Sequence, residues 1–165
     1  MVMHNQKANT LQRGIQKLAA RPLASRLLAR ILPTLDNAVM LITGTRFNAT
    51  SLLAGLPVIL LITVGAKSKL ERHTFLVAIS FENKLVLIAS NFGGKRHPNW
   101  YFNIKANPHV KASLPGQDAQ PYVARLIEGK ERIMYWKAAN QLYPGFQAYQ
   151  KRALPRTIPI IVLTP

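Results

Sequence analysis

Short runs of apolar residues, separated by polar turn residues, recur from about residue 57 to the end of the chain. The runs cover about residues 57–64, 73–82, 84–91, 109–114, 120–127 and 158–163. Their lengths and their content of Val, Ile, Leu and Phe are typical of β-strands. Tight turns are expected at Glu82-Asn83-Lys84 and at Pro115-Gly116. Strands at hairpin spacing, with helices inserted, favour an antiparallel barrel over a βαβ array. We therefore predict a mainly β, α+β fold.

Helical patterns occupy most of the rest of the chain. Helices are expected over about 97–106, 128–142 and 144–153, with one or two more between 11 and 42. In the last of these regions Leu23, Leu27, Ile31 and Leu35 recur every four residues, with Pro33 near the end of the pattern. Arg21, Arg26 and Arg30 lie elsewhere on the helical turn, so the segment reads as a basic amphipathic helix.

Two alternatives are open for this helix. Its apolar stripe packs on the domain, or residues 10–35 lie on an anionic membrane surface. A transmembrane span is not expected, because the longest apolar run, Leu52 to Val64, contains Gly55 and Pro57 and is shorter than the ~20 residues of a span. We predict a helical extension over residues 1–50 and one barrel domain over 51–165.

The charge balance of the chain is strongly basic. It has 22 Lys and Arg against 6 Asp and Glu, a net charge of +16, which predicts an anionic partner such as nucleic acid, lipid or a polyanionic small molecule. The absence of cysteine excludes disulfides, and the histidines are not at metal-ligand spacing, so no metal site is predicted. Without a secretory signal pattern the expected location is cytoplasmic, peripheral on the inner face of the cell membrane if the helix binds lipid.

The segment from Ser90 to Asn103 is the strongest candidate for chemistry. A strand leads into Gly93-Gly94 and the cations Lys95 and Arg96, and a short helix with aromatic residues follows. Small, cationic and aromatic residues close together suit a flat, anionic ligand that contains rings.

Two further patterns have a functional and a structural interpretation. The turn between the first two strands carries Lys67, Ser68, Lys69 and Arg72, which suit a phosphate or carboxylate but also a solvated charged hairpin. Tyr143, Phe146 and Tyr149 have i, i+3, i+6 spacing, typical of one helical face that lines either a core or a pocket.

Four segments together resemble one known family. They are Ser90–Asn103, Gly55–Thr63 with Gly65–Arg72, Leu142–Gln150, and Thr157–Pro165. In order and spacing they are similar to the deazaflavin-dependent nitroreductase family, which has a split β-barrel related to FMN-binding split barrels. The resemblance implies an oxidoreductase that uses the reduced 8-hydroxy-5-deazaflavin coenzyme, coenzyme F-420, to transfer a hydride to a quinone, an enone or a nitro compound.

The resemblance also implies roles for individual residues. The acceptor pocket would contain Tyr143, Phe146 and Tyr149, with Tyr149 or solvent as the proton source. The coenzyme-binding residues would be Lys67, Ser68, Lys69, Arg72, His73, Phe75, Ala89, Ser90, Asn91, Arg96, Trp100, Tyr101 and Asn103.

The chain departs from the family pattern at three positions. Ala66 replaces the usual Arg, while Lys69 and Phe92 replace glycines. These changes leave open a split barrel that binds FMN or haem instead. A basic, non-enzymatic nucleic-acid-binding protein is a third interpretation, although a recognition helix and a base-stacking motif are missing from the sequence. Both a monomer and a homodimer are compatible with the pattern.

Overall fold

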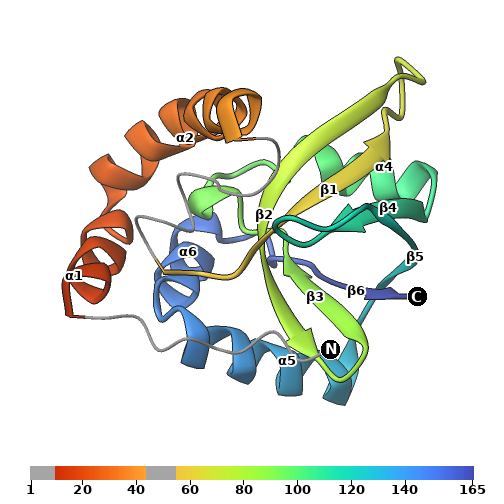
Figure 1. Cartoon of the computed structure of the whole chain (residues 1–165). Helices are drawn as coiled ribbons and strands as arrows, with labels where there is room; N and C mark the ends of the chain where they lie inside the picture. Colours follow the sequence, from red (N-terminus) through yellow and green to blue (C-terminus); the bar gives the residue numbers. More distant parts are fainter. Residues whose placement is uncertain (1–9, 44–54) are drawn as a thin grey trace.

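The computed structural model describes residues 10–43 and 55–165, and in this part of the chain the strands form one closed antiparallel barrel. The strands follow one another around the barrel in the order β1-β2-β3-β6-β5-β4, and β4 pairs with β1 to close it (Figure 1). Their bounds are β1 Val58–Val64, β2 Glu71–Phe81, β3 Lys84–Ile88, β4 His109–Ser113, β5 Gln120–Leu126 and β6 Ile160–Thr164. The predicted antiparallel barrel is confirmed.

The helices lie outside the barrel wall. They are α1 Thr10–Ala19, α2 Pro22–Thr43, α4 Asn99–Ala106, α5 Gly129–Leu142 and α6 Gly145–Ala153, with a 3-10 turn η1 at Asn91–Gly93. The expected helices of the barrel domain are therefore present, with bounds shifted by a few residues at most. The hairpin between β2 and β3 is also confirmed, because Phe81 pairs with Lys84.

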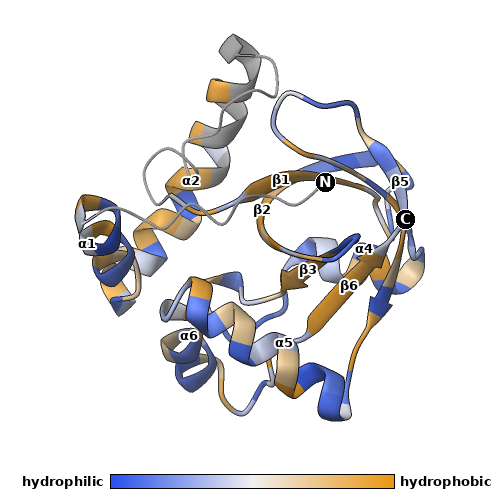
Figure 2. Cartoon of the chain, turned by 60° about the horizontal axis from the view of Figure 1, so that its bottom comes forward, coloured by the Kyte–Doolittle hydropathy of each residue, from blue (hydrophilic) through white to orange (hydrophobic). Residues whose placement is uncertain are grey.

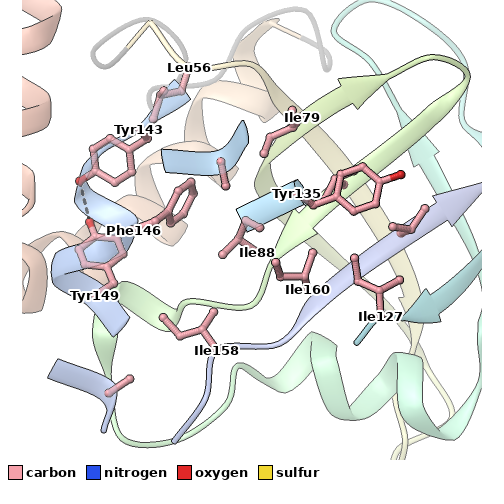
Figure 3. Packing of buried hydrophobic residues seen from close by; sticks show 14 residues of the cluster. Leu56, Ile79, Ile88, Ile127, Tyr135, Tyr143, Phe146, Tyr149, Ile158 and Ile160 are labelled. Atoms are coloured by element: carbon pink, nitrogen blue, oxygen red, sulfur yellow. Dashed lines mark hydrogen bonds between the residues drawn. The ribbon is translucent and has the colours of Figure 1, made fainter. Parts of the chain in front are cut away.

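Strands β3 and β6 are buried on both faces, which explains why they read as continuous apolar runs. Alternate residues of each strand enter two different hydrophobic clusters. Leu85 and Leu87 of β3 pack in one cluster with Trp100 of α4, whereas Val86 and Ile88 pack in the other with α5 and α6. Figure 2 shows the hydrophobic colouring along β3 and β6, and Figure 3 shows the second cluster.

The N-terminal helices differ from expectation in two ways. Helix α2 does not end near Pro33. Its backbone stays helical through this proline, and the helix runs to Thr43. Its predicted apolar stripe does not pack on the barrel: Leu23 is 79% exposed and Leu27 is 59% exposed, and Ile31 and Leu35 are also exposed. The first alternative for the stripe is therefore wrong.

Helix α2 instead meets the barrel domain through a neighbouring face. Leu28, Ala29 and Leu32 of that face are half-buried and line a cavity shared with β2, and α2 also contacts η1. Figure 1 shows α1 and α2 on the side of the barrel where α6 lies. No helix in the described ranges has the length and hydropathy required to cross a membrane. The predicted domain boundary at residues 50 and 51 lies outside the described residues.

Candidate functional site

A cavity of about 620 Å³ opens between the barrel and the N-terminal helices. Its walls are residues 73–77 of β2, the segment from Ser90 to Trp100, the aromatic residues at the start of α6, and the inner faces of α1 and α2. Segments far apart in the sequence therefore form one site, and the apolar part of its lining comes from both the barrel and the helices.

The predicted coenzyme residues divide into those that line this cavity and those that do not. His73, Phe75, Ser90, Asn91, Arg96 and Trp100 line it. Phe92, which replaces a family glycine, also lines it, with a left-handed φ of 52° and its ring 6.2 Å from that of Tyr149. Phe92 therefore turns toward the cavity.

Three other predicted residues, Ala89, Tyr101 and Asn103, are buried behind the cavity. Asn103 accepts a hydrogen bond at Oδ1 from the Ala66 amide, 3.0 Å away, and donates from Nδ2 to Thr63 Oγ1, also 3.0 Å away. It thereby ties α4 to the turn between β1 and β2. Its observed contacts are with this turn, so it shapes the neighbourhood of the predicted tail-binding cations.

The turn between β1 and β2 carries these cations at the end of the hairpin. Lys67, Lys69 and Arg72 are exposed, and Arg72 Nη2 donates to Ser68 Oγ over 3.2 Å. Lys69 adopts φ 58°, so this position keeps the left-handed backbone that a glycine would adopt without strain. Gly65 leaves no room for a side chain, because a Cβ there would lie 2.4 Å from Ser68 Oγ.

His73 follows this turn with its ring partly engaged. Its Nε2 lies 2.7 Å from Oε1 of Glu71, and both side chains are exposed. A carboxylate beside His73 offsets part of the positive field of the turn, so His73 is a weaker candidate for anion binding than the three cations.

The aromatic residues of the predicted acceptor pocket belong to the hydrophobic core and also line the cavity. Tyr143, Phe146 and Tyr149 are each at most 5% exposed, and their ring centroids lie 5.1–6.2 Å apart. They do not share one helix as expected, because Tyr143 ends α5 and precedes α6. Tyr143 has extended backbone geometry between the two helices, with φ −141° and ψ 98°, and the three rings lie together (Figure 3).

The two tyrosine hydroxyls form a small network with helix α1. They lie 2.9 Å apart, and each lies 3.4 Å from a carbonyl of α1, that of Gln16 for Tyr143 and that of Ala19 for Tyr149. Each hydroxyl has one hydrogen, so at any time one hydroxyl donates to the other, which donates to its carbonyl. Burial raises the pKa of both Tyr143 and Tyr149 above the ordinary tyrosine value.

Arg152 of α6 completes the attachment of the N-terminal helices. Its guanidinium donates to the Ala20 carbonyl over 2.7 Å, and to Ser25 Oγ and the Phe92 carbonyl over 3.2 Å each. It also lies 4.9 Å from the centre of the Tyr149 ring. A cation at the C-terminal end of α1 meets carbonyls that lack partners within that helix.

The sequence did not identify Arg152 as a site residue, nor did it identify Arg156, which lies between α6 and β6. It donates hydrogen bonds of 2.8–3.2 Å to the carbonyls of Ala89, Ser90 and Gly94 and to His97 Nδ1. The sequence feature that could have indicated Arg156 is its position, a cation shortly before an apolar strand. Nothing in the spacing indicated its partners, which lie about sixty positions earlier in the chain.

Comparison with known proteins gives consistent results for sequence and structure. The family model described as F420H(2)-dependent quinone reductase matches residues 37–165. An F420H(2)-dependent quinone reductase of Mycobacterium tuberculosis and a putative one of Mycobacterium bovis are each 34% identical over 119 residues, which cover 66% of this chain and 73% of theirs.

Solved structures with similar folds point the same way. One described as an F420-H2 dependent reductase (FDR-A) is 38% identical with a TM-score of 0.59, and the match covers 65% of this chain and 93% of that one. Another, described as a domain-swapped dimer, is 39% identical with a TM-score of 0.59 and covers 65% of this chain and 79% of its own.

Substitution of Arg152 should loosen the N-terminal helices. We expect Arg152→Ala to lower the free energy of unfolding by about 1 to 3 kcal/mol, because the partly buried carbonyls of Ala20 and Phe92 lose a charged donor. Hydrogen exchange should rise in α1 and in the first turns of α2. The neighbouring exposed Lys151→Ala is the control. Equal exchange in the two variants would contradict the attachment.

The paired tyrosines should make stability fall at alkaline pH. Since folding raises the pKa of Tyr143 and Tyr149, the unfolded chain releases these protons first, and their contribution is lost as pH rises above about 10. Urea unfolding between pH 9 and 11 would measure the decline, which should be smaller in the Tyr143→Phe/Tyr149→Phe variant. Tyr122→Phe in β5 is the control. An unchanged decline in the double variant would contradict this interpretation.

Proposed function

Since the chain belongs to the F420H(2)-dependent quinone reductase family, we propose that its cavity binds the reduced deazaflavin coenzyme beside a quinone. The chain is an F420-dependent oxidoreductase that acts on quinones. The observation that carries the proposed site is a single cavity that joins six of the predicted coenzyme residues to the wall formed by Tyr143, Phe146 and Tyr149. The coenzyme supplies the hydride, and the protein supplies binding and orientation.

The residues present suit such a coenzyme. The cavity volume of about 620 Å³ lies within the range of about 300 to 1,000 Å³ that is usual for small-molecule sites. Phe75 and Trp100 offer apolar faces to a flat ring. Lys67, Lys69 and Arg72 are exposed on the turn that follows β1, where they are available to the phosphate and carboxylates of an anionic tail.

The acceptor is expected on the other side of the cavity. Ile15, Leu28 and Leu32 of the N-terminal helices face Phe146 across this space, and together they form an apolar environment suited to a lipophilic quinone. Ser90 and Asn91, which follow β3, add polar side chains to the lining of the cavity. The side chains of the cavity thus hold the two reactants in a fixed relation and exclude water from the space between them.

A reduced quinone also needs a proton, and the tyrosines are poor donors of it. Donation by Tyr149 would leave a phenolate in a buried place, and burial raises the pKa of this hydroxyl. The hydrogen bond with Tyr143 and the nearby Arg152 lower the pKa of Tyr149, but burial is the larger influence and raises it. Of the two proton sources predicted from the sequence, solvent therefore fits better, and the tyrosines shape and orient the pocket.

The proposed coenzyme site is tested by titration with the oxidised deazaflavin coenzyme and, separately, with FMN. Quenching of ligand fluorescence measures binding. We expect saturable binding of the deazaflavin and much weaker binding of FMN, and then hydride transfer from the reduced coenzyme to a quinone. Preferential binding of FMN would contradict the proposed ligand.

The double variant Lys67→Ala/Arg72→Ala tests the anchoring turn. We expect coenzyme affinity to fall about ten- to a hundredfold, because two charge-assisted contacts to the tail are lost in an exposed place. The variant Lys130→Ala/Lys137→Ala removes the same charge from the exposed face of α5 and should bind as the unchanged protein does. Retained affinity in the Lys67/Arg72 variant would argue strongly against the anchoring role.

A membrane surface is the second partner that we propose. Leu23, Leu27, Ile31 and Leu35 form an exposed apolar stripe on α2, and Arg26 and Arg30 are exposed beside it. Apolar side chains flanked by cations match the acyl boundary and the headgroups of anionic lipid. Leu28 and Leu32 of the same helix line the cavity, so a lipophilic quinone would be near its source. This arrangement would place the protein at the inner face of the cell membrane.

Sedimentation with vesicles tests this surface. We expect binding to vesicles with anionic lipid, weaker binding to zwitterionic vesicles and release at high salt. Leu23→Ser/Leu27→Ser should abolish binding, whereas Val123→Ser/Leu126→Ser, at exposed positions of β5, should not. Self-association of the unchanged protein without lipid binding would instead assign the stripe to a homodimer, which stays an open prediction.

A further inference from the structure

The guanidinium of Arg156 defines the protonation of His97. It lies 3.2 Å from His97 Nδ1, and an arginine has donors only. Nδ1 must therefore accept, which requires an unprotonated nitrogen at that position. In a neutral imidazole the hydrogen then resides on Nε2. His97 lines the cavity, so a hydrogen on Nε2 is the donor that the ring can offer to a ligand there.

The surroundings of His97 hold the ring in place and oppose its protonation. Tyr101 of α4 lies beside it, with ring centroids 4.7 Å apart and an interplanar angle of 33°, and Phe102 meets it edge to face at 6.0 Å. The charged groups that act on the ring, Arg156 and Lys105, are both cationic. Burial and these two cations lower the pKa of His97 below the ordinary value.

Arg156 is itself fixed by the loop on which His97 lies. Its other hydrogen bonds go to the carbonyls of Ala89, Ser90 and Gly94, which follow one another where the chain leaves β3. The guanidinium thus has a single orientation relative to the loop. Moving the ring hydrogen of His97 to Nδ1 would set that N–H against an N–H of Arg156.

We propose that Arg156 is a positioning residue that holds His97 as the neutral Nε2–H tautomer, so that His97 donates a hydrogen bond to an oxygen of the bound coenzyme. Because burial and the two cations lower the pKa of His97, this donor stays neutral down to a lower pH than a free histidine does. The role of the donor rests on the proposed coenzyme site, whereas the tautomer follows from the ligand-free structure.

Nitrogen NMR of the histidine rings tests the tautomer without coenzyme. We expect His97 to show an unprotonated Nδ1 and a protonated Nε2, and to titrate at a lower pH than a free histidine. Arg156→Gln should move the titration of His97 to higher pH, whereas Arg132→Gln, which removes a half-buried arginine of α5 that donates to the Ile158 carbonyl, should not. A protonated Nδ1 in the neutral ring, or an unchanged titration of His97 in Arg156→Gln, would overturn the proposal.

Coenzyme binding tests the donor itself. His97→Phe keeps an aromatic ring beside Tyr101 but has no donor, and we expect about tenfold weaker binding, the change that follows from one lost hydrogen bond. His97→Gln returns an N–H near the position of Nε2 and should restore most of the affinity. Both variants are compared by thermal unfolding, so that a loss of folding is recognised.

The two proposals fail in different ways. If the unchanged protein does not bind the coenzyme, the proposed function is wrong, and the NMR result still decides the tautomer. If the unchanged protein and His97→Phe bind the coenzyme equally well, the donor role is overturned while the coenzyme site stands.

Discussion

The binding of one guanidinium to a row of backbone carbonyls is the constraint on which the site depends. Where the chain leaves β3 it stops pairing with β6, and Arg156 donates to the carbonyls of Ala89, Ser90 and Gly94, of which that of Ser90 also accepts from the Gly93 amide. Arg156 reaches them from the segment just before β6. The course of the loop toward α4, and with it the position of Trp100 at the cavity, follows from this arrangement.

A second arginine, Arg152, holds the N-terminal helices by donating to a backbone carbonyl in the same way. Arg152 donates to the carbonyl of Ala20, the residue that directly follows α1. Tyr143 and Tyr149 meet two further carbonyls of α1. The cavity has one wall made of α1 and α2, so these polar contacts connect the aromatic pocket to its cover. The acceptor side of the cavity is therefore formed by residues of the barrel domain together with residues of α1 and α2.

Several residues of the family motifs do not line the cavity themselves but support neighbouring residues. Asn103 is part of the segment that resembles the coenzyme-contact helix, yet its side chain holds Thr63 and the Ala66 amide. Tyr101 backs His97 and Ala89 contributes its carbonyl to Arg156. A sequence motif marks residues that are needed at a site, and it does not distinguish the residues that touch a ligand from those that hold the loops in shape.

The sequence by itself determined the barrel, the helices around it and the family, because apolar runs, turn residues and four spaced motifs are local features. It also identified the amphipathic character of α2, but not which face of that helix would meet the barrel. Only the tertiary structure decided that Leu28 and Leu32 turn toward the cavity while Leu23 and Leu27 stay exposed. It likewise decided the partners of Arg152, Arg156 and His97, because hydrogen bonds between segments about sixty or more positions apart leave no periodic pattern in the chain.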